Sequence, residues 1–419
     1  MRIAVIGLGY VGLPLAAALS HHFETLGFDI SASRIDELRK GLDRTGELSP
    51  ERLAAAPLGL SAEADDIAGA DVFIVTVPTP LDEEKRPDLG AVLAASRTIG
   101  ARLGTGALVV YESTVWPGVT EDICVPELER ASSLAAGTDF HVGYAPERMN
   151  PGDPAHGLEH ITRVVAGQTP EIAERLAALY GTVNGGNVFI ARDIRTAEAA
   201  KVIENAQRDV NIAFINEVAQ VFCTLGLSTH DVLDAARTKW NFLDFRPGLV
   251  GGHCVGVDPY YLAHRAEEVG RDPLIVLASR RTNEAMGAFI VEQIERRLEG
   301  AAGPVLVLGI TFKENVPDIR NTQVPDMVAA LAARGIETAV HDPFADPDEV
   351  ERRYGIRLLP GLDGAGGYAC VLGVVAHAPY RAFTTATFAS LLAPGGLVAD
   401  IKNMWRDTPL PAGLRRWTL

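Results

Sequence analysis

The sequence predicts an α/β protein in which two doubly wound parallel-sheet domains are joined by a central helical domain. Short apolar runs alternate with helical patterns up to about residue 195 and again from about residue 303, which is typical of parallel βαβ units. Between these parts, residues 196–225 show apolar side chains at helical spacing, with no glycine or proline inside. We therefore expect domains at residues 1–195, 196–299 and 300–419.

The candidate strands are short apolar runs that are separated by helical or turn patterns. In the first domain they lie at residues 3–6, 25–28, 72–77, 107–111, 141–144 and 163–166. In the last domain they lie at residues 305–308, 338–341, 370–375 and 397–399, with a helix over 325–334. The central domain continues in helical patterns to about residue 299 and is interrupted by a Gly- and Pro-rich loop at residues 246–259.

Composition limits the kinds of partner that we expect. The chain has 54 acidic and 38 basic residues, and the formal net charge of −16 argues against binding to nucleic acid or to an anionic membrane. The chain contains no run of about 20 apolar residues free of glycine and proline, so we expect no membrane span. The four cysteines form no CxxC pair, which argues against a disulfide framework and fits a reducing cytoplasm. We expect no metal, because adjacent ligands such as His253 and Cys254 rarely make a site.

A glycine fingerprint follows the first predicted strand and opens a helical pattern. Its GxGxxG sequence runs from Gly7 to Gly12 and includes the candidate cofactor residues Gly7, Gly9, Tyr10, Val11 and Gly12. Asp29 ends the next strand, where a carboxylate binds the adenosine ribose and repels a 2′-phosphate, so the pattern favours NAD over NADP. Arg34 could instead neutralise a phosphate, which keeps NADP open. The first domain is therefore predicted to be a Rossmann-like NAD-binding domain. The last domain repeats the order of elements without the glycines, so we expect a Rossmann-like domain for another ligand.

Polar residues follow three further strands whose carboxyl ends should meet at the same crevice. One group contains Pro78 and Thr79, the second contains Thr114, and the third contains Glu147 and Arg148. Each segment could also be an ordinary turn or a solvated surface group. As part of a site, Glu147 would hold or activate a water molecule.

Basic residues at three places predict contacts to an anionic ligand or intermediate. Lys201 and Asn205 share one face of the long helix, where an ammonium and an amide would stabilise an oxyanion. Phe312 and Lys313, and separately Lys402, follow strands of the last domain, where a lysine suits a phosphate. The alternative for each lysine is a solvated surface side chain.

The loop that contains Gly251, Gly252 and Cys254, with Asp258 four residues after the cysteine, is the most informative segment. The two glycines permit close backbone approach, which suits a ligand and suggests no packing role. A thiol beside a nicotinamide can hold an aldehyde as a thiohemiacetal, and a second oxidation then gives a thioester. The alternative is a buried, inert cysteine.

Seven motifs occur in one order along the chain: GLGYVG, VPTP, ESTVWPG, APERMNPGD, KVIEN, GGHCVGVDP and FKENVPDIR. Together they resemble the UDP-glucose/GDP-mannose dehydrogenase family over essentially the whole chain. The resemblance implies NAD-dependent oxidation of a sugar C6 alcohol to a carboxylate, a UDP-sugar substrate and a homodimer formed through the helical domain.

The resemblance also implies roles for individual residues. Cys254 would be the nucleophile, Lys201 and Asn205 would stabilise the oxyanion, and Asp258 would assist Lys201 and a bound water. Glu147 and Thr114 would serve thioester hydrolysis. Further substrate contacts are implied for Arg148, Arg246, Gly251, Phe312, Lys313 and Lys402, and a cofactor contact for Arg320.

The thiol loop departs from the UDP-glucose pattern, because Val257 stands where that pattern has a lysine. The loop resembles the branch that acts on UDP-N-acetylhexosamines (UDP-GlcNAc and UDP-GalNAc) for surface polysaccharide synthesis. UDP-glucose and UDP-ManNAc remain alternative substrates. Two other kinds of protein are alternatives. A single-step β-hydroxyacid dehydrogenase would need neither the thiol nor the last domain. A non-catalytic NAD-binding protein would need none of the residues Cys254, Lys201, Asn205, Glu147 and Asp258.

Overall fold

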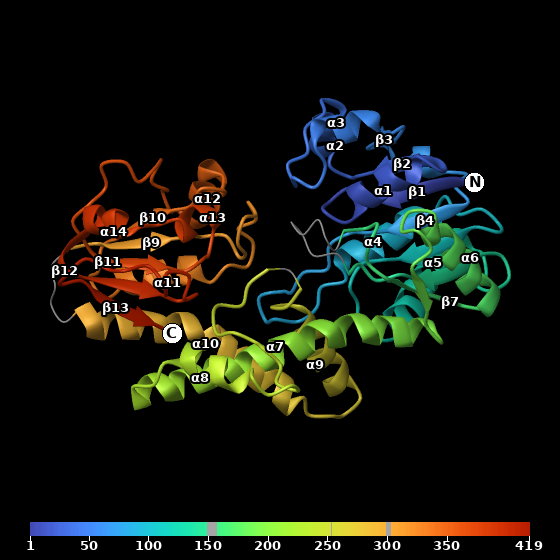
Figure 1. Ribbon diagram of the computed structural model, residues 1–419. Coiled ribbons are helices and arrows are strands. Elements are labelled where there is room, and N and C mark those ends of the chain that lie inside the picture. Colours follow the sequence, from blue (N-terminus) through green and yellow to red (C-terminus); the bar gives the residue numbers. More distant parts are fainter. Residues whose placement is uncertain (149–156, 253, 299–302) are drawn as a thin grey trace. The chain divides into compact units, whose positions relative to one another are not determined.

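The computed structural model describes residues 1–148, 157–252, 254–298 and 303–419 (Figure 1). Residues 149–156, 253 and 299–302 lie outside the described part, and they include His253 of the thiol loop. The chain forms two compact units. The first comprises Met1–Glu204 and Tyr260–Asp272, and the second comprises Asn205–Pro259 and Pro273–Leu419. The predicted division into three domains differs from this division and stays a prediction.

The first unit contains an eight-stranded sheet in the order β3-β2-β1-β4-β5-β6-β7-β8. The strands are β1 (Arg2–Ile6), β2 (Glu24–Phe28), β3 (Gly59–Ser61), β4 (Val72–Val75), β5 (Leu108–Tyr111), β6 (His141–Tyr144), β7 (Arg163–Gly167) and β8 (Val188–Ile190). All six predicted strands are confirmed to within two residues at each end. The short strands β3 and β8 were missed, because three residues make too short a run for a periodic pattern.

One pair in this sheet departs from the predicted parallel arrangement. Strands β6 and β7 run antiparallel, with Gly143 opposite Gly167 and Tyr144 opposite Ala166, whereas the other pairs are parallel. Because β7 is reversed, its first residue, Arg163, lies at the edge where β1, β4, β5 and β6 end. The reversal therefore brings a charged side chain to the edge that carries the predicted cofactor residues.

Helices surround this sheet and bury its apolar strands. They are α1 (Gly12–Ser20), α2 (Ala32–Arg39), α3 (Pro50–Ala55), α4 (Gly90–Gly100), α5 (Val125–Ser132) and α6 (Pro170–Gly181), with the short helices η1 (Ala64–Ile67) and η2 (Val119–Cys124). Helix α9 (Asp258–Glu268) begins in the second unit and enters the first unit at Tyr260. The side chains of Ser31, Ser49 and Thr169 cap the N-termini of α2, α3 and α6, which fixes where these helices begin. The residues of β4 and β5 are fully buried, as expected for strands that are covered on both faces.

The second unit contains a five-stranded parallel sheet in the order β10-β9-β11-β12-β13. The strands are β9 (Val305–Leu308), β10 (Thr338–His341), β11 (Tyr368–Gly373), β12 (Leu392–Asp400) and β13 (Arg415–Thr418), and the helices beside them are α11 (Val324–Ala332), α12 (Pro347–Tyr354), α13 (Ala378–Arg381) and α14 (Thr385–Leu391). The four predicted strands are confirmed. Strand β13 was missed because it begins with two arginines and shows no apolar run.

Three more helices complete the fold: α7 (Ile194–Leu225), α8 (Thr229–Ala236) and α10 (Leu274–Leu298). Helix α7 is the long helix that the sequence predicted, and it has 32 residues (Figure 1). Asn216 of α7 donates to Asn283 of α10 at 2.8 Å, and both side chains are buried, which fixes the pairing of these helices. Within the described residues, no helix is both long enough and apolar enough to cross a membrane.

Candidate active site

The carboxyl ends of five parallel strands in the first unit bring the predicted cofactor residues to one edge of the sheet. Gly7 follows β1 and Asp29 follows β2, whereas Pro78 and Thr79 follow β4. Thr114 follows β5, and Glu147 and Arg148 follow β6. The open crevice at such an edge is where ligands bind in doubly wound sheets.

The glycine turn between β1 and α1 fits a dinucleotide. Gly7 has a φ of +95°, which favours glycine, and a Cβ on Gly12 would lie 1.9 Å from the Gly7 carbonyl oxygen. Both positions therefore need glycine for the fold of the turn. Gly9 is different, because a Cβ there would meet no atom within 4 Å. The space in front of Gly9 and the N-terminus of α1, which Tyr10 and Val11 precede, suits a pyrophosphate.

Asp29 lies beside this turn, as the predicted ribose contact requires. Its Oδ2 accepts a hydrogen bond from the Leu8 backbone N–H at 2.8 Å, and its Oδ1 accepts from Ser31 N–H at 2.9 Å. Arg34 is buried; its Nε donates to the Leu8 carbonyl at 3.0 Å and its Nη2 to Asp43 at 2.6 Å. Arg34 thus supports the turn, and a cofactor contact of its own stays a prediction.

Three hydroxyl groups outside the predicted site residues hold the loops after β4 and β1. Thr76 Oγ1 donates to the Gly7 carbonyl at 2.7 Å, and Ser113 Oγ donates to the Val77 carbonyl at 2.6 Å. The hydroxyl of Tyr261, at the start of α9, donates to the Thr79 carbonyl at 2.7 Å. These contacts join segments that are up to 182 residues apart, so no local pattern could have indicated them.

Glu147 lies in a buried group of charged side chains. Its Oε2 accepts from Arg163 Nη1 at 2.8 Å, and only 7% of Glu147 is exposed. Arg148 makes a different contact, since its guanidinium pairs with Glu204 of α7 at 2.8 Å. The alternative that Glu147 is a solvated surface group is therefore excluded by its burial, whereas its role on a substrate stays a prediction.

Helix α7 carries Lys201 and Asn205 one turn apart, and both side chains are buried. One turn earlier, Glu198 accepts from the backbone N–H groups of Gly118 at 2.6 Å and Thr120 at 2.9 Å. Burial raises the pKa of Glu198 to about 7. Glu198, which the sequence reading missed, thus ties the loop that follows Thr114 to the helix of Lys201.

The thiol loop is organised around Asp258 in the second unit. The Asp258 N–H donates to the Cys254 carbonyl at 2.8 Å, and Asn205 Nδ2 donates to Asp258 Oδ2 at 2.6 Å. Only 1% of Asp258 is exposed, and Cys254 is partly exposed. In contrast, burial raises the pKa of Cys124 to about 12 and raises that of Cys370 as well. Cys124 and Cys370 thus match the inert alternative, and Cys254 does not share their burial.

The two glycines before the cysteine have a packing role, contrary to the expectation from the sequence. Gly252 has a φ of +83°, and a Cβ there would lie 2.8 Å from the ring of Phe312. A Cβ on Gly251 would lie 2.8 Å from the carbonyl oxygen of Asn321. The backbone of the thiol loop therefore packs directly on the segment that carries Phe312, which no other residue type would permit.

Four of the predicted substrate residues line one pocket in the second unit: Gly251, Phe312, Lys313 and Lys402. The pocket is lined by these two lysines and by Glu314. Burial lowers the pKa of Lys402, and the nearby Glu314 opposes this effect. Arg246 and Arg320 are not among the residues that line the pocket. Arg246 pairs with Asp234 at 3.2 Å and with Asp244 at 2.8 Å, and Arg320 pairs with Asp318 at 2.7 Å.

A buried histidine holds the segment that carries Lys313. His377 Nδ1 accepts from the Asn315 N–H at 2.9 Å, and its Nε2 lies 3.0 Å from Asp342 Oδ2. Burial by itself would raise the pKa of Asp342. The hydrogen bond and charge of His377, together with the backbone N–H groups of Ile310 and Phe344, outweigh it and lower this pKa to about 2. Asp342 occupies the place of Asp29 in this second Rossmann-like arrangement. Like Asp29, it accepts from a backbone N–H of the turn after the first strand, since its Oδ2 accepts from Ile310 N–H at 2.7 Å; in addition, it contacts His377.

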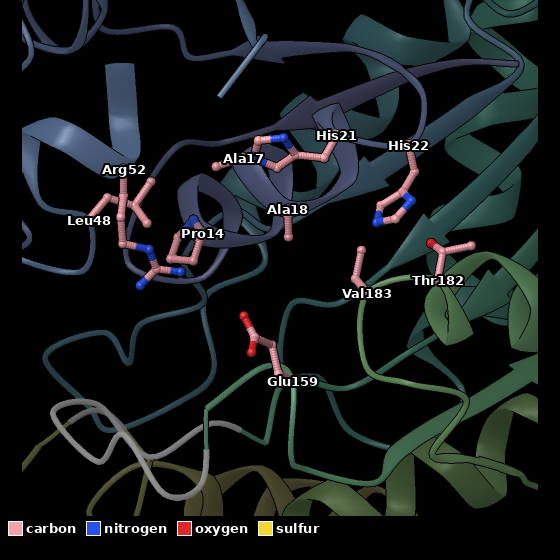
Figure 2. Close-up of a pocket in the computed structure, with 10 residues that line it drawn as sticks. All are labelled: Pro14, Ala17, Ala18, His21, His22, Leu48, Arg52, Glu159, Thr182 and Val183. Atoms are coloured by element: carbon pink, nitrogen blue, oxygen red, sulfur yellow. The ribbon is translucent and has the colours of Figure 1, made fainter. Parts of the chain in front are cut away.

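A second hollow lies along α1 in the first unit and contains none of the predicted site residues. Figure 2 shows its ten lining side chains, which come from α1 and the residues just after it, from the region of α3, from Glu159 and from the end of α6: Pro14, Ala17, Ala18, His21, His22, Leu48, Arg52, Glu159, Thr182 and Val183.

Comparison with known proteins identifies the family. Three models of the UDP-glucose/GDP-mannose dehydrogenase family match this chain: the NAD binding domain over residues 1–184, the central domain over 195–285 and the UDP binding domain over 306–407. A UDP-N-acetyl-D-glucosamine 6-dehydrogenase of Pseudomonas aeruginosa is 49% identical over 387 residues, which are 91% of this chain and 92% of that protein.

Two further relatives agree with this result. Protein CapL of Staphylococcus aureus is 46% identical over 423 residues, which cover 100% of this chain and 99% of that protein. The structure of a UDP-D-ManNAc dehydrogenase from Pyrococcus horikoshii is 30% identical, with a TM-score of 0.89 and 99% of each chain covered. These matches confirm the resemblance drawn from the motifs and the prediction of NAD as cofactor. The chain therefore belongs to the UDP-glucose/GDP-mannose dehydrogenase family and is an NAD-dependent nucleotide-sugar dehydrogenase.

Proposed function

We propose that this enzyme oxidises the C6 hydroxyl of a UDP-N-acetylhexosamine to a carboxylate, with UDP-GlcNAc as the first candidate substrate. The named UDP-N-acetyl-D-glucosamine 6-dehydrogenase is 49% identical, whereas the named UDP-D-ManNAc dehydrogenase structure is 30% identical. Val257, which replaces the lysine of the UDP-glucose pattern, favours the same branch. Within that branch the product would serve surface polysaccharide synthesis.

One observation carries the proposal of a double oxidation: the hydrogen bond from Asn205 to Asp258 joins the thiol loop to the helix of Lys201. A single oxidation needs no thiol at this place, whereas a thiol here can carry an aldehyde to the acid level through a thiohemiacetal and a thioester. Sγ of Cys254 adds to the aldehyde carbon, and the resulting oxyanion is stabilised by the Lys201 ammonium and the Asn205 amide. Asp258 fixes the Asn205 amide and compensates the charge of Lys201.

The remaining steps need a hydride acceptor and a water molecule. NAD, when bound at the Gly9 turn, accepts one hydride in each oxidation. Water then adds to the thioester carbonyl, Glu147 accepts a proton from it, and the Cys254 thiolate leaves with the C–S bond pair. Thr114 assists at this step. Two NAD and one water are consumed for each carboxylate that forms.

We also propose that the uridine diphosphate binds at the pocket that Lys313 and Lys402 line, and that two chains form a dimer through α7. Lys313 and Lys402 lie in the part of the chain that matches the UDP binding domain of the family, and Gly251, which also lines the pocket, lies in the part that matches the central domain. Helix α7 exposes Ile203, Phe214, Val221 and Leu225, which lie along one stripe because their spacings are whole helical turns. A stripe of this kind on a long helix is typical of a buried interface.

The first test is the amount of NADH that is formed per substrate consumed, measured with limiting UDP-GlcNAc, UDP-GalNAc, UDP-ManNAc and UDP-glucose in parallel. We expect two NADH per N-acetylated sugar. Cys254→Ser should abolish uronate formation, with a loss of at least about 10³-fold in kcat/KM. Cys223→Ser is the matched control, because Cys223 lies in α7 and contacts Gln293 instead.

Other outcomes would contradict parts of the proposal. One NADH per substrate would indicate a single oxidation, as in a β-hydroxyacid dehydrogenase. Turnover of UDP-glucose alone would leave the double oxidation in place and refute the N-acetylhexosamine branch. Uronate formation at the normal rate by Cys254→Ser would refute the role of the thiol.

A further inference from the structure

Four side chains form a buried polar group in the first unit, here called the Arg163 cluster: Glu112, Glu147, Arg163 and Tyr180. Arg163 Nη2 donates to Glu112 Oε2 at 2.5 Å, and its Nη1 donates to Glu147 Oε2 at 2.8 Å. The Tyr180 hydroxyl donates to Glu112 Oε1 at 2.5 Å, and the guanidinium carbon lies 5.0 Å from the centroid of the Tyr180 ring. Arg163 is thus held on two sides and over one face.

The cluster is almost completely buried, and such groups are costly. The side chains of Arg163 and Glu112 are 0% exposed, and that of Glu147 is 9% exposed. Burial raises the pKa of Glu112, and the nearby Arg163 opposes that rise. A buried ion pair usually stabilises a fold no better than apolar residues of the same volume would. Its presence is therefore better explained by the geometry that it imposes on Glu147.

The topology of the sheet explains how Arg163 reaches this place. Glu112 follows β5 and Glu147 follows β6, so both lie at the carboxyl edge of the parallel strands. Strand β7 runs antiparallel to β6, and its first residue therefore lies at the same edge. A parallel β7 would have put Arg163 at the opposite edge. The antiparallel pairing of β6 and β7 thus places the guanidinium of Arg163 between the carboxylates of Glu112 and Glu147, at the edge that carries the predicted cofactor residues.

We propose that Arg163 is a positioning residue for Glu147 in the hydrolysis of the thioester. Arg163 holds Oε2 of Glu147, so that the carboxylate accepts a proton from water as that water adds to the thioester carbonyl; the C–S bond then breaks and the Cys254 thiolate leaves. Glu112 and Tyr180 fix the guanidinium from behind. No electron transfer belongs to this step. This inference rests on the proposed function and concerns only its hydrolysis step.

Its test separates the two halves of the reaction. In Arg163→Met, both oxidations precede the affected step, so a rapid burst of two NADH per active site should remain. Steady-state turnover should fall about 100-fold, which is a typical loss when a general base is misplaced. A covalent acyl adduct on Cys254 should accumulate and be visible by mass spectrometry of the quenched protein. The wild-type enzyme should show far less of this adduct.

Conservative variants keep the test valid if Arg163→Met does not fold. Arg163→Lys retains the charge but has one nitrogen for two carboxylates, so turnover should recover partly and the adduct should decrease. The double variant Arg163→Met/Glu112→Gln removes the like charges that Arg163→Met would leave buried together, and it should show the same adduct. Arg102→Met is the matched control, because Arg102 pairs with the exposed Asp65 at the surface of the same unit.

Two results would overturn the inference. If burst amplitude and turnover fall together in a folded Arg163 variant, Arg163 supports the fold or both steps equally. If all Arg163 variants turn over at the wild-type rate, the contact has no role in hydrolysis. In both cases, two NADH per substrate from the wild-type enzyme would leave the proposed function intact. A wild-type enzyme that yields one NADH would refute the proposed function and this inference with it.

Discussion

Glu198 shows how a single buried carboxyl can make the stability of the protein depend on pH. Its folded pKa of about 7 lies above the ordinary value of 4.5 because the side chain is buried. The folded protein therefore binds this proton more tightly than the unfolded chain does. The contribution of Glu198 to stability is fully present below about pH 4.5 and is lost as the pH rises toward about 7.

We expect Glu198→Gln to remove this part of the pH dependence. In the wild type the loss between those two pH values amounts to roughly 3 kcal/mol in the free energy of unfolding. The amide side chain that this substitution introduces does not titrate, so the variant should show a flatter curve. Urea unfolding of both proteins at several pH values between about 4.5 and 8 measures the difference.

The control for this experiment is Glu174→Gln, which removes an exposed carboxyl of α6 and should leave the slope of the wild type unchanged. Parallel curves for the wild type and Glu198→Gln would show that Glu198 does not retain its proton in the folded protein.

Some of the buried charged residues of the first unit and the thiol loop were predictable from the sequence and others were not, for a physical reason. Glu147 and Asp258 stand beside turn or glycine motifs, where a carboxylate is noticeable. Arg163 and Glu198 instead lie inside a strand and a helix, where a charged residue usually faces solvent. Only the three-dimensional contacts show that both are buried. The one available signal for Arg163 in the sequence was its place as a charged residue directly before the apolar run of β7.

At the scale of elements, the β1–α1 turn contains glycines that are present for two different reasons. Gly12→Ala should destabilise the turn, because its Cβ would lie 1.9 Å from a backbone oxygen that cannot easily move. Gly9→Ala should leave the free energy of unfolding within about 0.5 kcal/mol of the wild type. It should nevertheless weaken NAD binding about tenfold or more, since the new methyl group would occupy the space for the pyrophosphate.

Titration calorimetry with NAD and urea unfolding of both variants measure these two effects separately. Tight NAD binding by Gly9→Ala would show that the pyrophosphate does not approach this glycine. A fully stable Gly12→Ala would show that the turn can rearrange.

The direction of β7 is the feature of the sheet that the sequence could not provide. The run RVVAG is apolar and β-branched, and it would fit a parallel or an antiparallel neighbour equally well. The direction of β7 depends on the path of the chain that connects β6 to β7, and the residues of β7 themselves do not determine it. The strands themselves were predictable because burial on both faces gives continuous apolar runs.

At the scale of the whole molecule, the exposed stripe on α7 predicts how the enzyme assembles. Phe214 is 62% exposed and Leu225 is 64% exposed, although both are apolar. Phe214→Glu should weaken a dimer that buries this stripe by about 100-fold or more in Kd, because the charge would be desolvated at the interface. Sedimentation velocity over a range of concentrations measures the shift to monomer.

Leu42→Glu is the control for this prediction, since Leu42 is 58% exposed in the loop after α2 and lies far from α7 in the sequence. If Phe214→Glu sediments as the wild type does, then α7 is not the dimer interface.

The division of the chain into units has a consequence for chimeras between relatives. The chain passes from one unit to the other three times, after Glu204, after Pro259 and after Asp272. The short insert Tyr260–Asp272 contributes Tyr261, whose hydroxyl holds the Thr79 carbonyl and whose ring lies 5.9 Å from that of Trp116. In a chimera with one crossover between residues 204 and 260, this insert would come from one relative, whereas its contact residues Thr79 and Trp116 would come from the other. A chimera should therefore keep its function only when residues 260–272 and residues 1–204 come from the same relative.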